Sequence, residues 1–81
     1  MNLNQRKKEI LKIVSINLID NKISFNYRNN VINAEDYFKL TIYSKGEVEI
    51  IANNYNKDFK FLSDVSNAFI LDVIDSIIFN Y

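Results

Sequence analysis

The only glycine of the chain, Gly46, lies between two runs of alternating apolar and polar residues that together span residues 36–53. Alternation with a period of two is typical of a strand that is buried on one face, so the two runs predict a β-hairpin. Directly opposed residues point to the same side of a sheet, so the apolar sides coincide in one register: Ile42 opposite Val48, Leu40 opposite Ile50 and Phe38 opposite Ala52. This register leaves residues 44–46 as a three-residue loop, in which glycine can take the left-handed conformation that such loops need.

The composition limits the kinds of protein that this chain can form. Its 81 residues include no cysteine and no histidine, which excludes disulfides, thiolate metal sites and the commonest general base. Apolar residues make up 48% of the chain, too many for a disordered protein, but no apolar run approaches the ~20 residues of a transmembrane helix, and the start lacks the layout of a secretory signal. We therefore expect a single domain over residues 1–81, soluble and cytoplasmic, without a cofactor and without membrane association.

The charges are unevenly spread along a chain whose formal net charge is zero. Residues 1–30 carry six basic and two acidic side chains, whereas residues 31–81 carry four basic and eight acidic ones. A chain that is basic in its first part and acidic in its second suits a protein partner, or self-association, better than it suits nucleic acid alone.

Residues 12–19 can be interpreted as helix or as strand. Good helix formers predict a short N-terminal helix that ends near residue 11, and apolar residues at helical spacing could continue it to residue 18. The same stretch is crowded with β-branched residues and could instead pair with residues 22–28 across a turn at residues 20–21. That hairpin would have three apolar pairs: Leu18 with Ile23, Ile16 with Phe25 and Val14 with Tyr27. Because all three pairs match in character, we prefer the strand.

The remaining segments complete an α+β arrangement. Residues 29–35 are expected to form a polar loop, residues 53–58 break the pattern, and a long helix is predicted from about residue 60 or 63 to residue 79. The apolar positions of this helix cover too wide an arc for one sheet to bury, so either the first helix lies beside it or part of it is a surface for a dimer or another partner. The predicted fold is a short N-terminal helix, an antiparallel three- to four-stranded β-meander and a long apolar C-terminal helix packed on the sheet.

The sequence offers few groups for catalysis. Without histidine or cysteine there is no Ser-His or Cys-His nucleophile, and one glycine is too few for a phosphate-binding glycine-rich loop. Acid pairs such as Glu47/Glu49 and Asp72/Asp75 could in principle hydrolyse glycosides or hold Mg²⁺, but we expect them on the solvent side of a strand and of the last helix. We therefore predict no enzymatic activity, no catalytic residue and no metal site.

Two groups of residues are candidates for binding. A basic cluster on the first helix could contact phosphates or an acidic protein surface, or could be a solvated helix face: Arg6, Lys7, Lys8 and Lys12. On the outward face of the predicted sheet, tyrosines beside isoleucine and mixed charge are typical of protein interfaces. This outward face comprises Tyr37, Lys39, Thr41, Tyr43, Glu47, Glu49 and Ile51, with Ile13, Ile19 and Arg28 from the first predicted hairpin. It exists only if the helices leave it uncovered.

In outline, the whole chain resembles the small anti-CRISPR inhibitor proteins of phages and mobile elements. The resemblance consists of the opening MNLN, the glycine-containing hairpin KLTIYSKGEVEII, the asparagine-rich break that follows it and the apolar last helix. The chain departs from the inhibitors that mimic DNA, which are strongly acidic, because its net charge is zero. The resemblance implies a non-enzymatic protein that blocks a bacterial immune effector, such as a nuclease complex, by occupying its surface, with acids such as Glu47, Glu49, Asp64 and Asp72 or tyrosines as contacts.

A second hypothesis follows from the basic helix. The chain could be a small nucleic-acid-binding regulatory protein that uses the cluster around Arg6 and Lys8, acting as a homodimer through its C-terminal helix. Nucleic acid fits the neutral chain less well than a protein partner does, since Glu47 and Glu49 would repel phosphate from the neighbouring sheet face.

Overall fold

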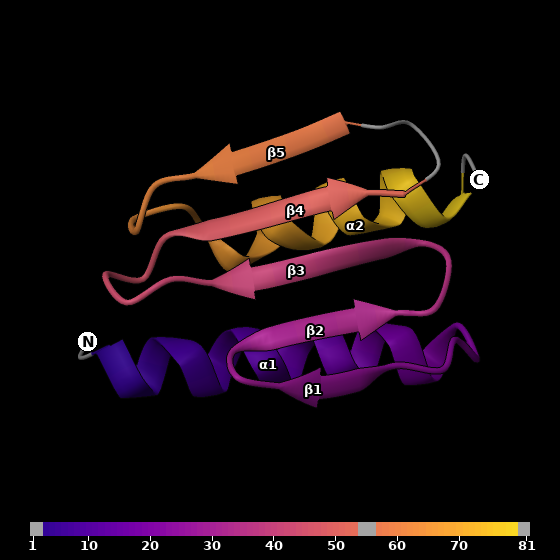
Figure 1. The fold of residues 1–81 in the computed structure, drawn as a ribbon, viewed down its shortest axis with the longest axis horizontal. Coiled ribbons are helices and arrows are strands. Elements are labelled where there is room, and N and C mark those ends of the chain that lie inside the picture. The colour runs from indigo at the N-terminus through magenta and orange to yellow at the C-terminus, as the bar shows by residue number, and fades with distance from the viewer. Residues whose placement is uncertain (1–2, 54–56, 80–81) are drawn as a thin grey trace.

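The computed structural model describes residues 3–53 and 57–79, which form two helices and five strands (Figure 1). In chain order the elements are α1 (Leu3–Asp20), β1 (Asn26–Arg28), β2 (Val31–Ala34), β3 (Phe38–Ile42), β4 (Val48–Ala52), β5 (Lys57–Phe61) and α2 (Asn67–Phe79). The strands form one antiparallel sheet in the order β1-β2-β3-β4-β5, so each strand pairs with its neighbour in sequence. The α+β architecture and the antiparallel meander predicted from the sequence are confirmed, but the sheet has five strands and not three or four.

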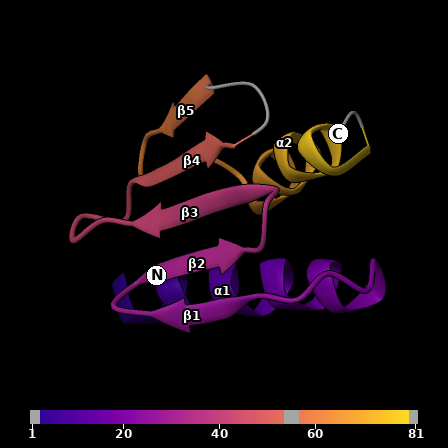
Figure 2. The ribbon, with the colours of Figure 1, turned by 45° about the vertical axis from the view of Figure 1, so that its right-hand side comes forward.

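Both helices lie on the same side of the sheet, with α1 behind β1 and β2 and α2 behind the second half of the meander (Figures 1 and 2). The side chains that fill the core come from one stripe of each helix and from the facing side of the strands. They are Ile10, Val14 and Leu18 of α1, Ile70, Ile74 and Ile77 of α2, and Ile23, Ile32, Ala34, Phe38, Leu40, Ile42, Val48, Ile50 and Ala52 between the helices in the sequence. No described helix covers the other side of the sheet. Neither described helix is long and apolar enough to cross a membrane.

The hairpin around Gly46 forms in the predicted register. Strands β3 and β4 pair Phe38 with Ala52, Leu40 with Ile50 and Ile42 with Val48. The turn is closed by two backbone hydrogen bonds, from the Gly46 N–H to the Tyr43 carbonyl at 2.9 Å and from the Tyr43 N–H to the Glu47 carbonyl at 2.8 Å. Gly46 has a φ of 87°, which is the left-handed conformation that the three-residue loop requires.

The strand predicted over residues 12–19 is wrong, because α1 continues to Asp20. One side of this helix places Ile10, Val14 and Leu18 fully in the core, whereas Ile16, which the strand would have buried, is 50% exposed. The helix ends in a Schellman motif: the Ile23 N–H donates to the Leu18 carbonyl at 2.9 Å and the Lys22 N–H donates to the Ile19 carbonyl at 3.0 Å. Lys22 takes the left-handed position with a φ of 58°. The match between Leu18 and Ile23 is therefore the apolar contact of a helix end and not a cross-strand pair.

Two further predictions about local structure are wrong. The expected polar loop over residues 29–35 contains β2, which joins β1 through a two-residue turn at Asn29 and Asn30. Both asparagines have positive φ, 52° and 65°, as the favoured two-residue hairpin turns require. Strand β5 occupies the place where the long helix was expected to begin, so α2 begins only at Asn67, where the Ser66 hydroxyl oxygen accepts a hydrogen bond from the Phe69 N–H at 3.2 Å. Residues 54–56 of the expected break lie outside the described residues.

The C-terminal helix is less covered than its apolar sequence indicates. Three of its isoleucines, Ile70, Ile74 and Ile77, are buried, but Phe69 is 52% exposed and Phe79 is 71% exposed. Most of the remaining positions are exposed or half-buried. The helix contributes one fully buried stripe to the core, Val73 and Ile78 beside this stripe are half-buried, and the outward positions are exposed.

The Gly46→Ala substitution tests the role of the left-handed turn. A Cβ at this φ lowers the free energy of unfolding by roughly 1–2 kcal/mol. In a domain of this size, each kcal/mol lost lowers the melting temperature by roughly 4–8 °C. Thermal unfolding followed by circular dichroism measures this fall. The matched control is Ser44→Ala, an exposed position in the same loop, which should leave the melting temperature near that of the wild type. Equal effects of the two substitutions would contradict the argument.

Candidate binding surface

The uncovered side of the sheet carries side chains in rows that run across the strands. Since opposed residues share a side, the strand pairing defines one row of Arg28, Val31, Thr41, Glu49 and Lys60. A second row consists of Asn26, Asn33, Lys39, Ile51 and Asp58. Basic, acidic and apolar side chains therefore alternate over this surface, which we call the open face.

The structure brings most of the predicted contact residues together on the open face. Lys39, Glu49 and Ile51 lie in its two rows, and Tyr43 and Glu47 follow at the end of β3 and before β4, where their backbones pair. Tyr43 is 45% exposed. The sequence predicts this face on the condition that the helices leave it uncovered. The described helices meet this condition, so the open face is present.

Of the predicted members of this surface, one is half-buried and two lie elsewhere. Tyr37 is half-buried and packs against the core, and its backbone links β2 to the end of β4 through hydrogen bonds with Ala34 and Asn53. Ile13 and Ile19 belong to α1, on the opposite side of the sheet, because residues 12–19 are helical. Arg28 stays on the open face, but it does so as part of β1.

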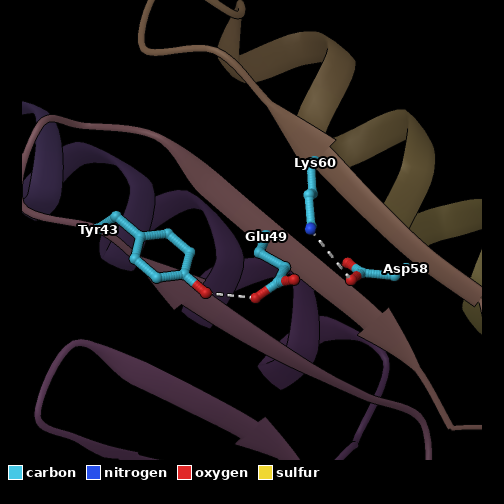
Figure 3. A network of polar contacts seen from close by, with 4 residues as sticks. All are labelled: Tyr43, Glu49, Asp58 and Lys60. Atoms are coloured by element: carbon cyan, nitrogen blue, oxygen red, sulfur yellow. Dashed lines mark hydrogen bonds and ion pairs between the residues drawn. The ribbon is translucent and has the colours of Figure 1, made fainter.

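A polar network links Tyr43, which follows β3, to β4 and β5 on the open face (Figure 3). The Tyr43 hydroxyl donates a hydrogen bond to Glu49 Oε1, and the Lys60 ammonium lies 4.0 Å from Asp58 Oδ2. The hydrogen bond from Tyr43, followed by one with Asp58, lowers the pKa of Glu49. The bond to Glu49 also raises the pKa of Tyr43. The pKa of Asp58 is raised by a hydrogen bond with Glu49, then by desolvation and by repulsion from the Glu49 carboxylate.

Sequence reasoning missed the part of the open face that β5 contributes, namely Asp58 and Lys60, together with Leu62, which follows it. In residues 58–61 charged residues alternate with Phe59 and Phe61, and this period of two could have identified the strand. With β5 in place, the side chains at one end of the sheet enclose a shallow hollow of about 280 Å³, lined by Tyr43, Glu47, Val48, Glu49, Lys60, Phe61 and Leu62. Its walls combine an aromatic ring, two carboxylates and apolar surface, so a long or aromatic side chain of another molecule can enter it.

The basic cluster is divided between structural and exposed roles. The Arg6 guanidinium donates from Nε to the Gly46 carbonyl at 3.2 Å and from a terminal nitrogen to the Val65 carbonyl at 3.0 Å. It thereby ties α1 to the hairpin turn and to the loop before α2. Lys7 is half-buried, and only Lys8 and Lys12 of the four predicted residues are exposed.

The described residues include no group of three or more acidic, histidine or cysteine side chains placed to hold a metal ion. No protein-family model, no curated protein and no solved structure matches this chain. The resemblance to anti-CRISPR inhibitors therefore rests on the outline of the sequence, and it stays a prediction together with the absence of enzymatic activity.

Replacement of Arg6 by alanine separates the structural role from a binding role. Arg6→Ala leaves two partly buried carbonyl groups without their donor, which costs about 1–3 kcal/mol for each group that water cannot reach. The free energy of unfolding from urea titration should fall by an amount in this range. Lys8→Ala, which removes an exposed charge from the same helix, should change it by less than about 0.5 kcal/mol. A stability of Arg6→Ala equal to that of Lys8→Ala would show that these hydrogen bonds do not stabilise the fold.

The two carboxylates of the network should affect stability with opposite pH dependence. The pKa of Asp58 is raised in the folded state, so its ionisation weakens the fold as the pH rises, and Asp58→Asn should raise the melting temperature at pH 7. The gain should shrink as the pH is lowered through the range in which Asp58 becomes protonated. The pKa of Glu49 is lowered, so Glu49→Gln should reduce the melting temperature at pH 7, and this loss should disappear below the folded pKa of Glu49.

Thermal unfolding of both variants and the wild type between about pH 2.5 and pH 7 checks these signs. The loss of the Lys60 ion pair in Asp58→Asn has little weight, since both side chains are well exposed. Parallel curves for the two variants would contradict the assignment.

Proposed function

We propose that this protein is a non-enzymatic binding protein that occupies the surface of another protein with the open face of its sheet. The observation that carries this proposal is the placement of both helices on one side, which leaves a five-stranded surface uncovered (Figures 1 and 2). A sheet backbone is rigid, so such a surface loses little conformational entropy when it binds.

The composition of the open face supports a protein partner. Tyr43 supplies exposed aromatic area beside the hollow, Ile51 supplies apolar area, and Lys39, Glu49 and Lys60 provide charges of both signs around them. An aromatic and apolar centre with polar surroundings is the usual anatomy of a protein interface. By its resemblance to anti-CRISPR inhibitors, the class of target that we propose is a bacterial immune effector, which the protein inhibits by blocking a surface.

The alternative function, binding of nucleic acid through α1, has less support. Arg6 donates its hydrogen bonds to backbone carbonyls of this chain, and the exposed side of α1 continues from Lys8 and Lys12 into Ile16 and Ile19. On the open face, Glu47, Glu49 and Asp58 repel phosphate.

The experiment compares two double variants in capture of a partner from a nuclease-treated bacterial lysate. Tyr43→Ala/Ile51→Lys changes the open face, and Lys7→Ala/Lys8→Ala removes charge from α1. A bound protein should be retained by the wild type and by the α1 variant, and its affinity for the open-face variant should fall by about 30-fold or more, since loss of a central tyrosine typically costs about 2 kcal/mol.

Circular dichroism establishes that both variants are folded. Retention of the partner by the open-face variant, or a partner that is captured only from a parallel lysate without nuclease, would overturn the proposal.

A further inference from the structure

On the surface that faces away from the sheet, α1 presents the exposed Lys12 and α2 presents the exposed Asp72. The residues of α1 that are buried in the core, together with those that face α2, fix the rotation of α1 about its axis. Helical periodicity then directs Lys12, Ile16 and Ile19 away from the sheet. The same reasoning directs Asp72 and Phe79 of α2 outward. Ile16 and Ile19 are 50% and 63% exposed. Within residues 3–53 and 57–79, Lys12 and Asp72 have no ion-pair partner.

These residues also match in their position along the helices. Both helices run in the same direction (Figures 1 and 2), and Asn17 Nδ2 donates to Asp75 Oδ1 at 2.9 Å, which places these two residues at the same level. Lys12 precedes Asn17 by five residues and Asp72 precedes Asp75 by three, so with a rise of 1.5 Å per residue their levels differ by only about 3 Å. Ile19 and Phe79 lie on the C-terminal side of the level that Asn17 and Asp75 share, and their own levels along the helix axes also differ by about 3 Å.

From this arrangement we infer that a second copy of this chain covers the helix layer, in a dimer whose two-fold axis runs parallel to the helices. Rotation about that axis lays α1 of each protomer over α2 of its partner and preserves the level of every residue. Lys12 then faces Asp72 of the second copy, and Ile19 faces Phe79 of the second copy, and each contact occurs twice. A two-fold axis in the same plane but perpendicular to the helices would lay α1 on α1 and α2 on α2, which opposes like charges.

The area of the helix layer indicates a weak dimer. Because α1 of one protomer lies over α2 of the other, the 13 residues of α2, about 20 Å long, limit the overlap, and two adjacent helices are about 20 Å wide, so the layer buries about 400 Å² on each protomer. The total of about 800 Å² lies well below the usual range of stable interfaces and corresponds to a weak, transient contact. We expect a dimer that forms only at high micromolar to millimolar concentration. The helix layer is on the opposite side from the open face, so this inference does not rest on the proposed function.

Sedimentation equilibrium on the purified chain tests the dimer between about 10 μM and 1 mM, the range in which an interface of this size should associate. The mass should rise from the 9.5 kDa of the monomer toward twice that value. Lys12→Glu and Asp72→Lys should each weaken association by about tenfold or more, because each places like charges together at two symmetric contacts. The double variant Lys12→Glu/Asp72→Lys restores opposite charges and should return the dissociation constant to near that of the wild type.

The matched control is Lys39→Glu, which makes the same change of charge on the open face and should leave the dimer intact. Because the chain has no cysteine, introduced thiols give a second test. A mixture of Lys12→Cys and Asp72→Cys should form a mixed disulfide dimer under mild oxidation faster than either variant alone.

A monomer at every concentration, a dimer that ignores the charge reversals, or a double variant that stays as weak as the single ones would overturn the inference. Preferential coupling of Lys12→Cys to itself would also overturn it.

Discussion

Burial of one face of the sheet beneath both helices is the constraint on which the described fold depends. Each helix supplies a single stripe of fully buried residues, with Val14 at the centre of one and Ile74 in the other, and the strands supply the facing side. The chain has no disulfide to add stability, so apolar contacts in this one layer must provide most of it. Arg6 adds hydrogen bonds at one end of the layer, where it joins α1 to Gly46 and Val65.

The parts of the fold that the sequence predicts correctly are those in which two independent signals agree. In the hairpin around Gly46, the alternation of apolar residues fixes the register and the glycine fixes the turn. Over residues 12–19 the apolar pattern does not distinguish helix from strand, because Val14 and Leu18 lie inward in both. The decision depends on whether Leu18 and Ile23 meet across a turn or at a helix end, and their apolar character is the same in both cases.

The candidate site was predictable where it lies on the central hairpin and not where it lies on the edge. Lys39, Glu49 and Ile51 follow directly from the register of β3 and β4, whereas Asp58 and Lys60 depend on β5, whose neighbouring residues are rich in asparagine and resemble a loop. The contact between Glu49 and Asp58 that shifts their pKa values joins two strands, so no spacing within one segment reveals it. Local patterns identify which face a residue occupies, but only the pairing of strands identifies its neighbours.

The open face and the helix layer differ in the kind of partner that they suit. On the open face charges of opposite sign are neighbours across the two rows, with Lys60 beside Asp58 and Lys39 near Glu49, so the surface has no polarity of its own. On the helix layer the exposed Lys8 and Lys12 lie on α1 and the exposed Asp72 lies on α2, and charges placed in this way are complementary to their own two-fold image. A dimer formed through that layer would direct two open faces outward on opposite sides. Binding through one open face would keep the second open face at a high local concentration near the next surface of the same target. A target with repeated or symmetric surfaces would therefore be bound more tightly than one with a single surface.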